Sequence, residues 1–317
     1  MTDHKSKQRI LHVTDYHIGA RYGGIPLTPI QFLEISKECD TLEDFVAKAK
    51  LPAHSPLSVL TTNIHKADSV MMTGDMIEFI NQDISVDDDT MIQVGLEFHR
   101  MLLNSASGKP VYEVLGNHER VKPYEIELAR LRVRHKNYHV NAEHFKIGDA
   151  LFIHGDIDIY PHLMVGERAY HKREQERGRH PDDQLVEYIG NHYVPRIMQK
   201  MPKLHQFLEK HLSPIIEDPN PLLYTAPNQA KIILHNLDVR LGREVIEGIN
   251  HIFLGHTHIP YQQLVARLNS DHTIALHNSG AVIKGNFEEF EPLMITLNHD
   301  TVESIKPIKS NHTQRFR

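Results

Sequence analysis

Five short polar signatures along the 317-residue chain combine carboxylate, amide and imidazole side chains, the groups that bind metal ions and transfer protons in enzymes. Each signature follows a short apolar run and contains a glycine. In chain order they are Asp15-Tyr16-His17-Ile18-Gly19, Gly74-Asp75-Met76-Ile77-Glu78, Gly116-Asn117-His118-Glu119, His154-Gly155-Asp156 and Gly255-His256-Thr257-His258. Oxygen and nitrogen donors without a thiolate suit manganese, iron or zinc in a reactive site better than a structural zinc site. The signatures therefore predict a metal cluster.

The spacing inside two of these signatures favours shared ligation. Residues i and i+2 of an extended segment point to the same side, so Asp15 with His17, and His256 with His258, can each offer two donors to one cluster. Histidine is abundant, with 25 residues, which fits metal binding but also makes chance His-x-His pairs more frequent. One signature alone is therefore weak, whereas five in order, each after an apolar run, are a strong signal.

The apolar runs before the signatures predict the strands that position them. These runs are Arg9–Val13, Ser69–Met72, Val111–Leu115, Ala150–Ile153 and His251–Leu254. Between the earlier runs lie helical patterns over Pro29–Lys50, Asp88–Leu103 and Pro123–His135. Strands that alternate with helices indicate an α/β protein, in which sites form where the carboxyl ends of several strands meet.

After Pro260 the sequence pattern changes from alternating strands and helices to consecutive strands. Five further strand patterns follow one another there, joined by Asn, Asp and Gly turns, and they predict a second sheet. They are Gln262–Ala266, Thr273–Leu276, Ala281–Ile283, Leu293–Leu297 and Val302–Ile305. Two long connections break the simple alternation, at residues 20–64 and at residues 155–250. Connections of such length are usually functional or form a subdomain, and the second is mostly helical in pattern.

The ordered set D-x-H-x-G, G-D-x-x-E, G-N-H-E, H-G and G-H-x-H resembles the calcineurin-like metallophosphoesterases. The resemblance extends from Ile10 to about Gly280, outside the two long connections. It implies an α/β fold of two packed mixed β-sheets flanked by helices, which agrees with the strand patterns. We therefore expect one metallophosphoesterase domain over residues 1–317, with a helical lid or cap insertion at about residues 156–249.

The resemblance also implies a role for individual residues. The expected metal ligands are Asp15, His17 and His258 for the first ion, Asn117, His154 and His256 for the second, and Asp75 as a bridge between them. His118 matches the catalytic histidine of the family, which faces the leaving group and does not bind metal. The expected cofactor is a pair of divalent ions, manganese in the first place, with iron or zinc as alternatives.

Several assignments around this set stay open. His154 has a rival in His235, which also ends an apolar run, and we prefer His154 because Gly-Asp follows it. Glu119 and Asp156 are expected to orient metal ligands through hydrogen bonds rather than to bind metal. Glu78 stands where many relatives carry aspartate, so we expect it to support the site or the fold.

The expected reaction is hydrolysis of a phosphoester bond by a phosphatase or phosphodiesterase. Two divalent ions about 3.5–4 Å apart would hold a phosphoryl group and lower the pKa of a bridging water. The hydroxide that bridges the metals would then attack phosphorus in line, and His118 would protonate the departing oxygen. No covalent phosphoenzyme is required.

Composition limits the cellular setting and the partners. A net charge of −6 gives little surface for duplex nucleic acid, so nucleic-acid binding is possible but not favoured. Cys39 is the only cysteine, which excludes an intramolecular disulfide and fits a reducing compartment. No apolar run reaches the length of a membrane span, and the polar start Met1–Gln8 shows no secretory signal. We expect a cytoplasmic protein.

Similarities to individual branches of the family give conflicting indications of the substrate. The start Ile10–Gly19 looks like the SbcD-type nucleases, which would make the protein a DNA exonuclease or phosphodiesterase. The long insertion after His154 is similar to the UDP-2,3-diacylglucosamine hydrolases, in which helices at this place form a lid over a lipid-linked nucleotide. Those enzymes carry Gly-Asn-Arg-Asp where this chain has Gly-Asn-His-Glu. We expect a small or nucleotide-containing phosphoester substrate.

Two further interpretations remain open. A catalytically silent binding scaffold would keep the fold and lose ligands, but all seven ligand positions and His118 are present. The insertion could pack onto the body or onto a second subunit through residues at helical spacing, so a homo-oligomer through the insertion is also an open interpretation. These residues are Leu204, Phe207, Leu208, His211 and Leu212.

Overall fold

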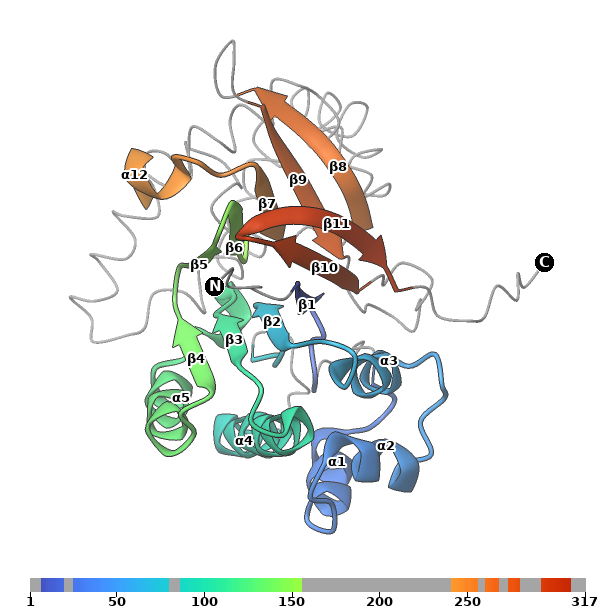
Figure 1. Cartoon of the computed structure of the whole chain (residues 1–317). Helices are drawn as coiled ribbons and strands as arrows, with labels where there is room; N and C mark the ends of the chain where they lie inside the picture. Colours follow the sequence, from blue (N-terminus) through green and yellow to red (C-terminus); the bar gives the residue numbers. More distant parts are fainter. Residues whose placement is uncertain are drawn as a thin grey trace, which may run out of the picture. The chain divides into compact units, whose positions relative to one another are not determined.

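The structure, a computed structural model, describes residues 7–19, 25–79, 86–155, 241–255, 260–267, 273–279 and 292–308 (Figure 1). The chain divides into two compact units, and nearly all of the described residues belong to the unit formed by Met1–Asp156, Glu244–Gln263 and Ile274–Arg317. No helix in these described ranges is long and apolar enough to cross a membrane.

The first sheet has six strands, and the loops that follow three of them carry polar residues of the candidate site. Its order is β11 (Thr301–Pro307), β10 (Leu293–Asn298), β1 (Gln8–Val13), β2 (Ser69–Thr73), β3 (Val111–Val114) and β4 (Tyr138–Asn141). Strands β1 to β4 run parallel, whereas β10 lies antiparallel to β1, with Ile295 opposite Ile10. The parallel strands therefore end at one edge of the sheet, where the loops after β1, β2 and β3 meet.

The second sheet has five strands and is also mixed. Its order is β5 (His144–Ile147), β6 (Ala150–Ile153), β7 (His251–Leu254), β9 (Thr273–Ser279) and β8 (Pro260–Arg267). Strand β5 is antiparallel to β6, and β6, β7 and β9 run parallel. The expected architecture of two mixed sheets is therefore confirmed.

The two sheets pack against each other through a layer of apolar side chains. Ile10 and Met71 of the first sheet meet Phe152 and Phe253 of the second in one buried cluster. The neighbouring residue Leu11 points to the other face of the first sheet, where the helices pack. Strands buried on both faces need apolar side chains at nearly every position, which is why the sequence shows them as continuous apolar runs.

Five helices lie on the outer side of the first sheet (Figure 1). They are α1 (Pro29–Ser36), α2 (Leu42–Lys48), α3 (Pro56–Ile64), α4 (Asp88–Ala106) and α5 (Lys122–Arg134). Helices α1 and α2 pack against α4 rather than against the strands. The long helix α4 begins where Asp87 accepts a hydrogen bond from the Thr90 amide, and it ends at Ser107 in the left-handed conformation. A short helix, α12 (Arg243–Ile246), precedes β7.

Some boundaries differ from the sequence-based expectation. The helix predicted over Pro29–Lys50 is two helices, because Thr41 starts α2 with its own capping box to Asp44. Helix α3 and the strands β4 and β5 were not predicted. Their short, partly polar segments give no clear periodicity over the window that such a prediction needs.

The strands after Pro260 do not form one sheet, which corrects the prediction of a separate C-terminal sheet. Strands β8 and β9 belong to the second sheet, whereas β10 and β11 extend the first. Strand periodicity cannot specify partners, because pairing depends on contacts with residues far away in the chain. The predicted strand Ala281–Ile283 and the predicted lid at about residues 156–249 lie outside the described residues, apart from α12 and its flanking turns.

Candidate metal centre

The loops after β1 and β2 run side by side and present their polar side chains together. The amide of Asp15 donates to Gly74 O at 3.0 Å, and the amide of His17 donates to Asp75 O at 2.9 Å. An isolated parallel bridge between Ile18 and Ile77 continues this pairing. The parallel register of β1 and β2 therefore brings the first two polar signatures into direct contact.

Three of the polar residues in these loops adopt the left-handed backbone conformation. The φ angles are 53° at Asp15, 46° at His17 and 53° at Asp75. Such conformations cost free energy for residues other than glycine, and they cluster at functional sites, where the surrounding structure holds them in place. The backbone hydrogen bonds between the two loops provide that support here.

The carboxylate of Asp75 lies at the centre of the group. It is fully buried, and its Oδ2 atom lies 3.2 Å from His154 Nε2 and 3.9 Å from His118 Nε2. Oδ1 accepts a hydrogen bond from the His118 amide at 3.1 Å, whereas Oδ2 accepts none from any described residue. A buried carboxylate oxygen that faces two imidazole nitrogens fits a metal cation better than it fits an apolar core.

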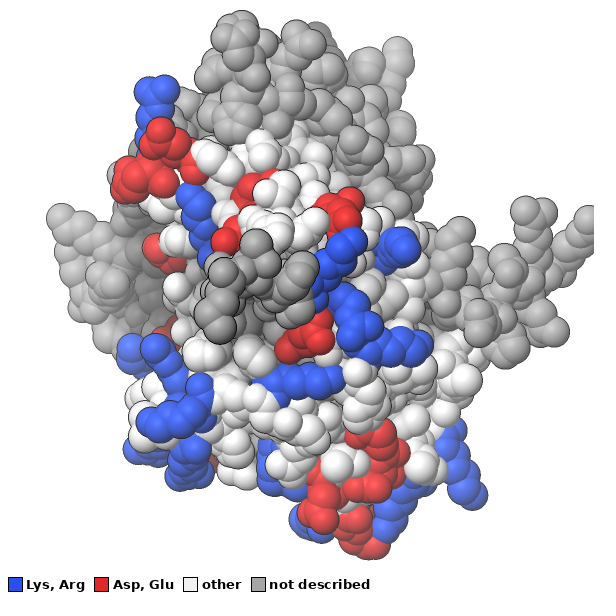
Figure 2. All heavy atoms as spheres, in the orientation of Figure 1, with Lys and Arg blue, Asp and Glu red and all other residues white. Residues whose placement is uncertain are grey.

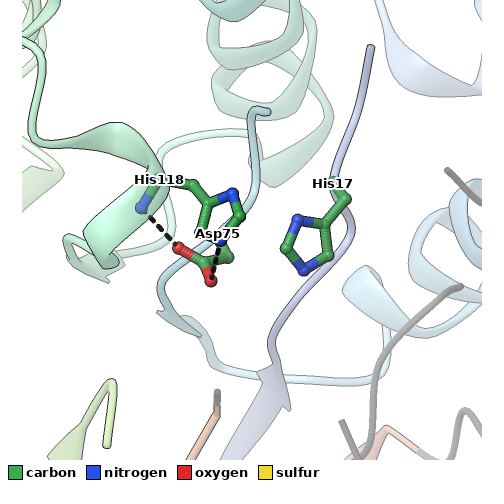
Figure 3. Close-up of side chains that lie close together, drawn as sticks. All are labelled: His17, Asp75 and His118. Atoms are coloured by element: carbon green, nitrogen blue, oxygen red, sulfur yellow. Dashed lines mark hydrogen bonds and ion pairs between the residues drawn. The ribbon is translucent and has the colours of Figure 1, made fainter. Parts of the chain in front are cut away.

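Two sets of donors share this carboxylate. In one set His17, Asp75 and His118 each bring a ligand atom within 4.8 Å of the others, and in the second set Asp15, Asp75 and His154 do the same. Figure 3 shows the first set, with both imidazole rings close to the carboxylate. The donor types and the shared carboxylate fit a pair of divalent cations.

Glu78 connects the histidine of the first signature with the histidine of the third. Its Oε2 lies 2.9 Å from His17 Nδ1, and its Oε1 lies 2.6 Å from His118 Nδ1. Both imidazoles donate from Nδ1, because an ionised carboxylate can only accept. The Nε2 atoms of His17 and His118 are therefore left to face the centre of the site.

The side chain of His154 is oriented by the backbone of β2. Its Nδ1 donates to the carbonyl of Thr73 at 2.8 Å, so its Nε2 is turned to Asp75. His12 Nε2 in turn lies 2.9 Å from Thr73 Oγ1, beneath the site and fully buried. A hydrogen bond at one ring nitrogen sets the tautomer that leaves the other nitrogen able to bind metal.

Glu119 fastens the loop after β2 to the loop after β3. Its Oε1 accepts from the amides of Met76 at 2.7 Å and Ile77 at 2.9 Å, and its Oε2 accepts from the Gly116 amide at 3.1 Å. The side chain is fully buried and follows Asn117 and His118 in the short 3₁₀ helix η1 (Asn117–Glu119). Glu119 therefore holds the loop that carries Asp75 against the loop that carries His118.

Two glycines are required by the close approach of the loops. A Cβ atom on Gly116 would lie 2.0 Å from Asp75 Oδ1, and one on Gly255 would lie 2.1 Å from Thr14 Oγ1 and 2.7 Å from Asp15 Oδ2. Gly255 also donates its amide to the carbonyl of His154 at 2.7 Å. The chain that leaves β7 thus passes directly beside Asp15 and His154.

Charge interactions in the buried site shift several pKa values. Burial opposes the ionisation of Asp75, but His154 and His118 outweigh it and hold the pKa of this carboxyl well below its usual range. For Glu78, burial is likewise outweighed by the hydrogen bonds from His118 and His17, so its pKa is also lowered. Burial lowers the pKa of His118, but the Asp75 and Glu78 carboxylates raise it more, and the net shift is upward.

Glu119 has the opposite shift. Its pKa is raised to about 8 by burial first, and then by the negative charges of Glu113 and Asp75, against the hydrogen bonds from the Gly116 and Ile77 amides. Divalent cations beside Asp75 would counteract this, because they favour the charged form of nearby carboxylates.

The structure brings together part of the predicted ligand set. Asp15, His17, Asp75 and His154 converge, and His118 lies among them with its Nε2 inside the first set of donors. The backbone of Asn117 lies in η1, and its side chain is outside the described part of the structure. His256 and His258 lie outside the described residues, as do Asp156 and the rival His235. The described segment that contains β7 ends at Gly255, which directly precedes His256 in the sequence and lies beside Asp15 and His154.

Two supporting residues had no signal in the sequence. Thr14 Oγ1 lies 2.5 Å from Asp15 Oδ2 and 3.0 Å from the carbonyl of Thr73, and Thr73 itself is the acceptor for His154. Threonine at the end of a buried strand is common, so only the three-dimensional pairing of β1 with β2 shows these contacts.

The sequence of the chain matches one family of known proteins. A sequence profile described as calcineurin-like phosphoesterase matches residues 8–260. No protein with a curated description matches the chain. Among solved structures, a dimetal phosphatase from Danio rerio is similar, with 12% sequence identity, coverage of 91% of this chain and 95% of that chain, and a TM-score of 0.37.

Proposed function

Since the chain belongs to the calcineurin-like phosphoesterases and is a metal-dependent phosphoester hydrolase, we propose that its centre holds two metal ions bridged by Asp75. The observation that carries this proposal is the position of the Asp75 carboxylate. Its buried Oδ2 lies 3.2 Å from His154 Nε2 and 3.9 Å from His118 Nε2, and Asp75 belongs to both sets of donors. Asp75 thus lies within 4.8 Å of donor atoms of Asp15 and His17, which we propose for one ion, and of His154, which we propose for the other, as a ligand shared by two cations must.

The proposed ligands extend beyond the described residues. Asp15 and His17 would hold the first ion with His258, and His154 would hold the second with Asn117 and His256. Manganese is the ion we propose first, with iron and zinc as alternatives, because the donors are carboxylate oxygen and imidazole nitrogen. When bound, the two ions would lower the pKa of a bound water and neutralise the charge that grows on the phosphoryl oxygens.

His118 is proposed as the general acid for the departing oxygen. The hydrogen bond from its Nδ1 to Glu78 fixes the ring, and its Nε2 faces the centre of the site. The carboxylates of Asp75 and Glu78 raise its pKa, which favours the protonated form that a general acid needs. Asp75 also receives the amide of His118, so the acid and the bridging ligand are fixed relative to each other.

The substrate we propose is a small or nucleotide-containing phosphoester. The long insertion after His154 would form a helical lid that admits compact substrates, and the net charge of −6 offers little attraction for duplex DNA. An SbcD-like exonuclease or phosphodiesterase is the second candidate, and the start of the chain favours it. A silent scaffold is disfavoured, because the described ligands converge as an active centre needs. The lone Cys39 supports the proposal of a cytoplasmic location.

Metal content and hydrolysis together test the proposal. The purified full chain, stripped by a chelator and reloaded with manganese, should bind two ions per chain by elemental analysis. It should hydrolyse aryl mono- or diesters. Fewer than one bound ion per chain, with no turnover, would contradict the proposed centre.

A comparison of substrates separates the two candidates. The intact protein and a variant with residues 156–249 trimmed to a short loop should be compared on duplex DNA, nucleotide conjugates and aryl esters. Efficient exonuclease activity of the intact protein would overturn the small-substrate proposal. An unchanged substrate profile after trimming would show that the insertion does not select substrates.

A further inference from the structure

Helix α5 carries an exposed apolar stripe on the face that points away from the core. Its buried face is formed by Tyr124, Leu128 and Leu131. On the opposite face Ile126 is 44% exposed and Val133 is 71% exposed, and the small residue Ala129 lies between them. The spacing of three and four residues places them in one row along the helix.

The charges beside this stripe are arranged with opposite signs at its two ends. Ile126 is flanked by Glu125 and Glu127, whereas Val133 is flanked by Arg132 and Arg134, so the sequence reads Glu-Ile-Glu at one end and Arg-Val-Arg at the other. Blue spheres gather over α5 at the lower left of Figure 2. When a second copy of the helix is placed antiparallel to the first, its basic end, with Arg132 and Arg134, lies beside the acidic end of the first copy, with Glu125 and Glu127.

We propose that α5 is a self-association surface, on which α5 of a second copy of this chain packs antiparallel about a two-fold axis between Ala129 and Arg130. In this arrangement Ile126 of each copy contacts Val133 of the other. The acidic end of each helix then lies against the basic end of its partner, with Glu127 facing Arg134 on one flank and Glu125 facing Arg132 on the other. A two-fold interface requires one surface to complement itself, and this sequence does so in shape and in charge.

The local contacts leave these charges able to pair across an interface. Arg132 and Arg134 have no ion-pair partner among the residues that the structure describes. Glu125 and Glu127 are paired within the helix, with Lys122 at 3.7 Å and with Arg130, but exposed pairs of this kind contribute little. Replacing them by pairs between two copies therefore costs little.

A groove beside α5 extends the same surface. It has a volume of about 580 Å³ and is lined by apolar Leu33, Ile92 and Leu96 together with acidic Asp89 and Glu127. Glu127 lies on the flank of α5 where Arg134 of the second copy would arrive. Ile30, the third large apolar side chain exposed in the described part of the chain, lies one turn before Leu33 on α1. The surface is thus wider than one helix, as a stable dimer needs.

This inference does not depend on the metal centre, and it differs from an oligomer formed through the insertion. The full-length protein should sediment as a dimer at high concentration and dissociate on dilution. Val133→Glu should weaken dimerisation by on the order of 100-fold, because symmetry places the new charge at two apolar contacts. Hydrolysis and the thermal unfolding midpoint serve as controls for the fold of each variant.

Charge reversal tests the antiparallel pairing itself. Arg132→Glu/Arg134→Glu makes both ends of the helix acidic, and Glu125→Arg/Glu127→Arg makes both ends basic, so each variant alone should be a monomer. A mixture of the two should form a heterodimer. Lys50→Glu/Lys306→Glu, which changes two exposed lysines elsewhere, should leave the dimer intact. A wild-type monomer at all concentrations, or a dimer that neither reversal affects, or a mixture that stays monomeric, would each overturn the proposal.

Discussion

His118 donates a hydrogen bond from Nδ1 to Glu78 Oε1 at 2.6 Å, and the other oxygen of the same carboxylate holds His17 at 2.9 Å. The proposed general acid and a proposed metal ligand are therefore oriented by one buried side chain. Glu78 itself is positioned by the pairing of two loops, since its amide donates to Ile18 O at 3.0 Å. Changes at Glu78 should thus affect acid catalysis and metal binding together.

Glu78→Gln should lower turnover and shift its pH profile. Loss of the charge removes one of the two carboxylates that raise the pKa of His118. The protonated acid would then be lost at a lower pH, so the alkaline limb of the profile should move downward. The glutamine amide has only one acceptor oxygen for the Nδ1 donors of His17 and His118, so His17 is oriented less firmly and metal affinity should fall by about 10–100-fold. A rate profile against pH and a metal titration measure the two effects, and an unchanged alkaline limb would contradict the role of Glu78.

Asp75→Asn and His118→Ala should separate metal binding from proton transfer. The first removes the charge of the only carboxylate shared by both donor sets, so we expect both ions to be lost. The second should keep both ions and lower kcat by roughly 10²–10⁴-fold, the usual size of a general-acid contribution. Elemental analysis and kcat on one aryl ester decide between the roles. If His118→Ala loses a metal ion, then His118 is a ligand in the first donor set.

Glu119→Gln should weaken metal binding while the protein stays folded. The amide nitrogen of glutamine cannot accept the hydrogen bonds that one carboxylate oxygen accepts, so either Gly116 or the Met76–Ile77 pair loses its acceptor. We expect metal affinity to fall by about 10–100-fold, as for other groups that orient ligands. Glu119→Ala should also lower the free energy of unfolding by roughly 3 kcal/mol or more, because three buried amides lose their acceptors.

The control for Glu119 is the same substitution at the exposed Glu143. Glu143→Gln should change neither metal affinity nor the unfolding midpoint. If Glu119→Gln binds metal as tightly as the wild type, the contacts between the two loops are structural and do not position the ligands.

One physical property of the buried strands allowed both the strands and the meeting of the polar residues at their ends to be predicted from the sequence. Strands such as β1 and β2 are buried on both faces, so they appear as continuous apolar runs that end at the polar loops. The sequence could not predict the supporting contacts. Glu78 meets His17 because Ile18 pairs with Ile77, and His154 meets the Thr73 carbonyl because the two sheets pack face to face. Contacts between residues far apart in the chain leave no periodic pattern.

The same limit applies to helix ends and sheet membership. The apolar pattern over Pro29–Lys50 runs through the break at Thr41, because each of the two helices buries apolar side chains and packs against α4. Strand β10 has the alternating burial of a strand with one buried face, and this pattern does not reveal that β10 pairs with β1 on one side and with β11 on the other. Local sequence patterns therefore predict where helices and strands form, whereas contacts between distant residues determine which strands pair.

Replacing His277 with phenylalanine should reduce the acid sensitivity of folding. His277 is buried in the second sheet and stacks on Phe253 with ring centroids 4.9 Å apart. Burial first, and then the neighbouring His251, lower its pKa from 6.5 to about 3. Between these values the unfolded chain binds a proton that the folded chain does not, so stability is lost as the pH falls through this window. The loss attributable to His277 is at most roughly 4–5 kcal/mol. Urea unfolding of the chelator-treated protein at several pH values should show a shallower slope for His277→Phe, and an equal slope would refute the assignment.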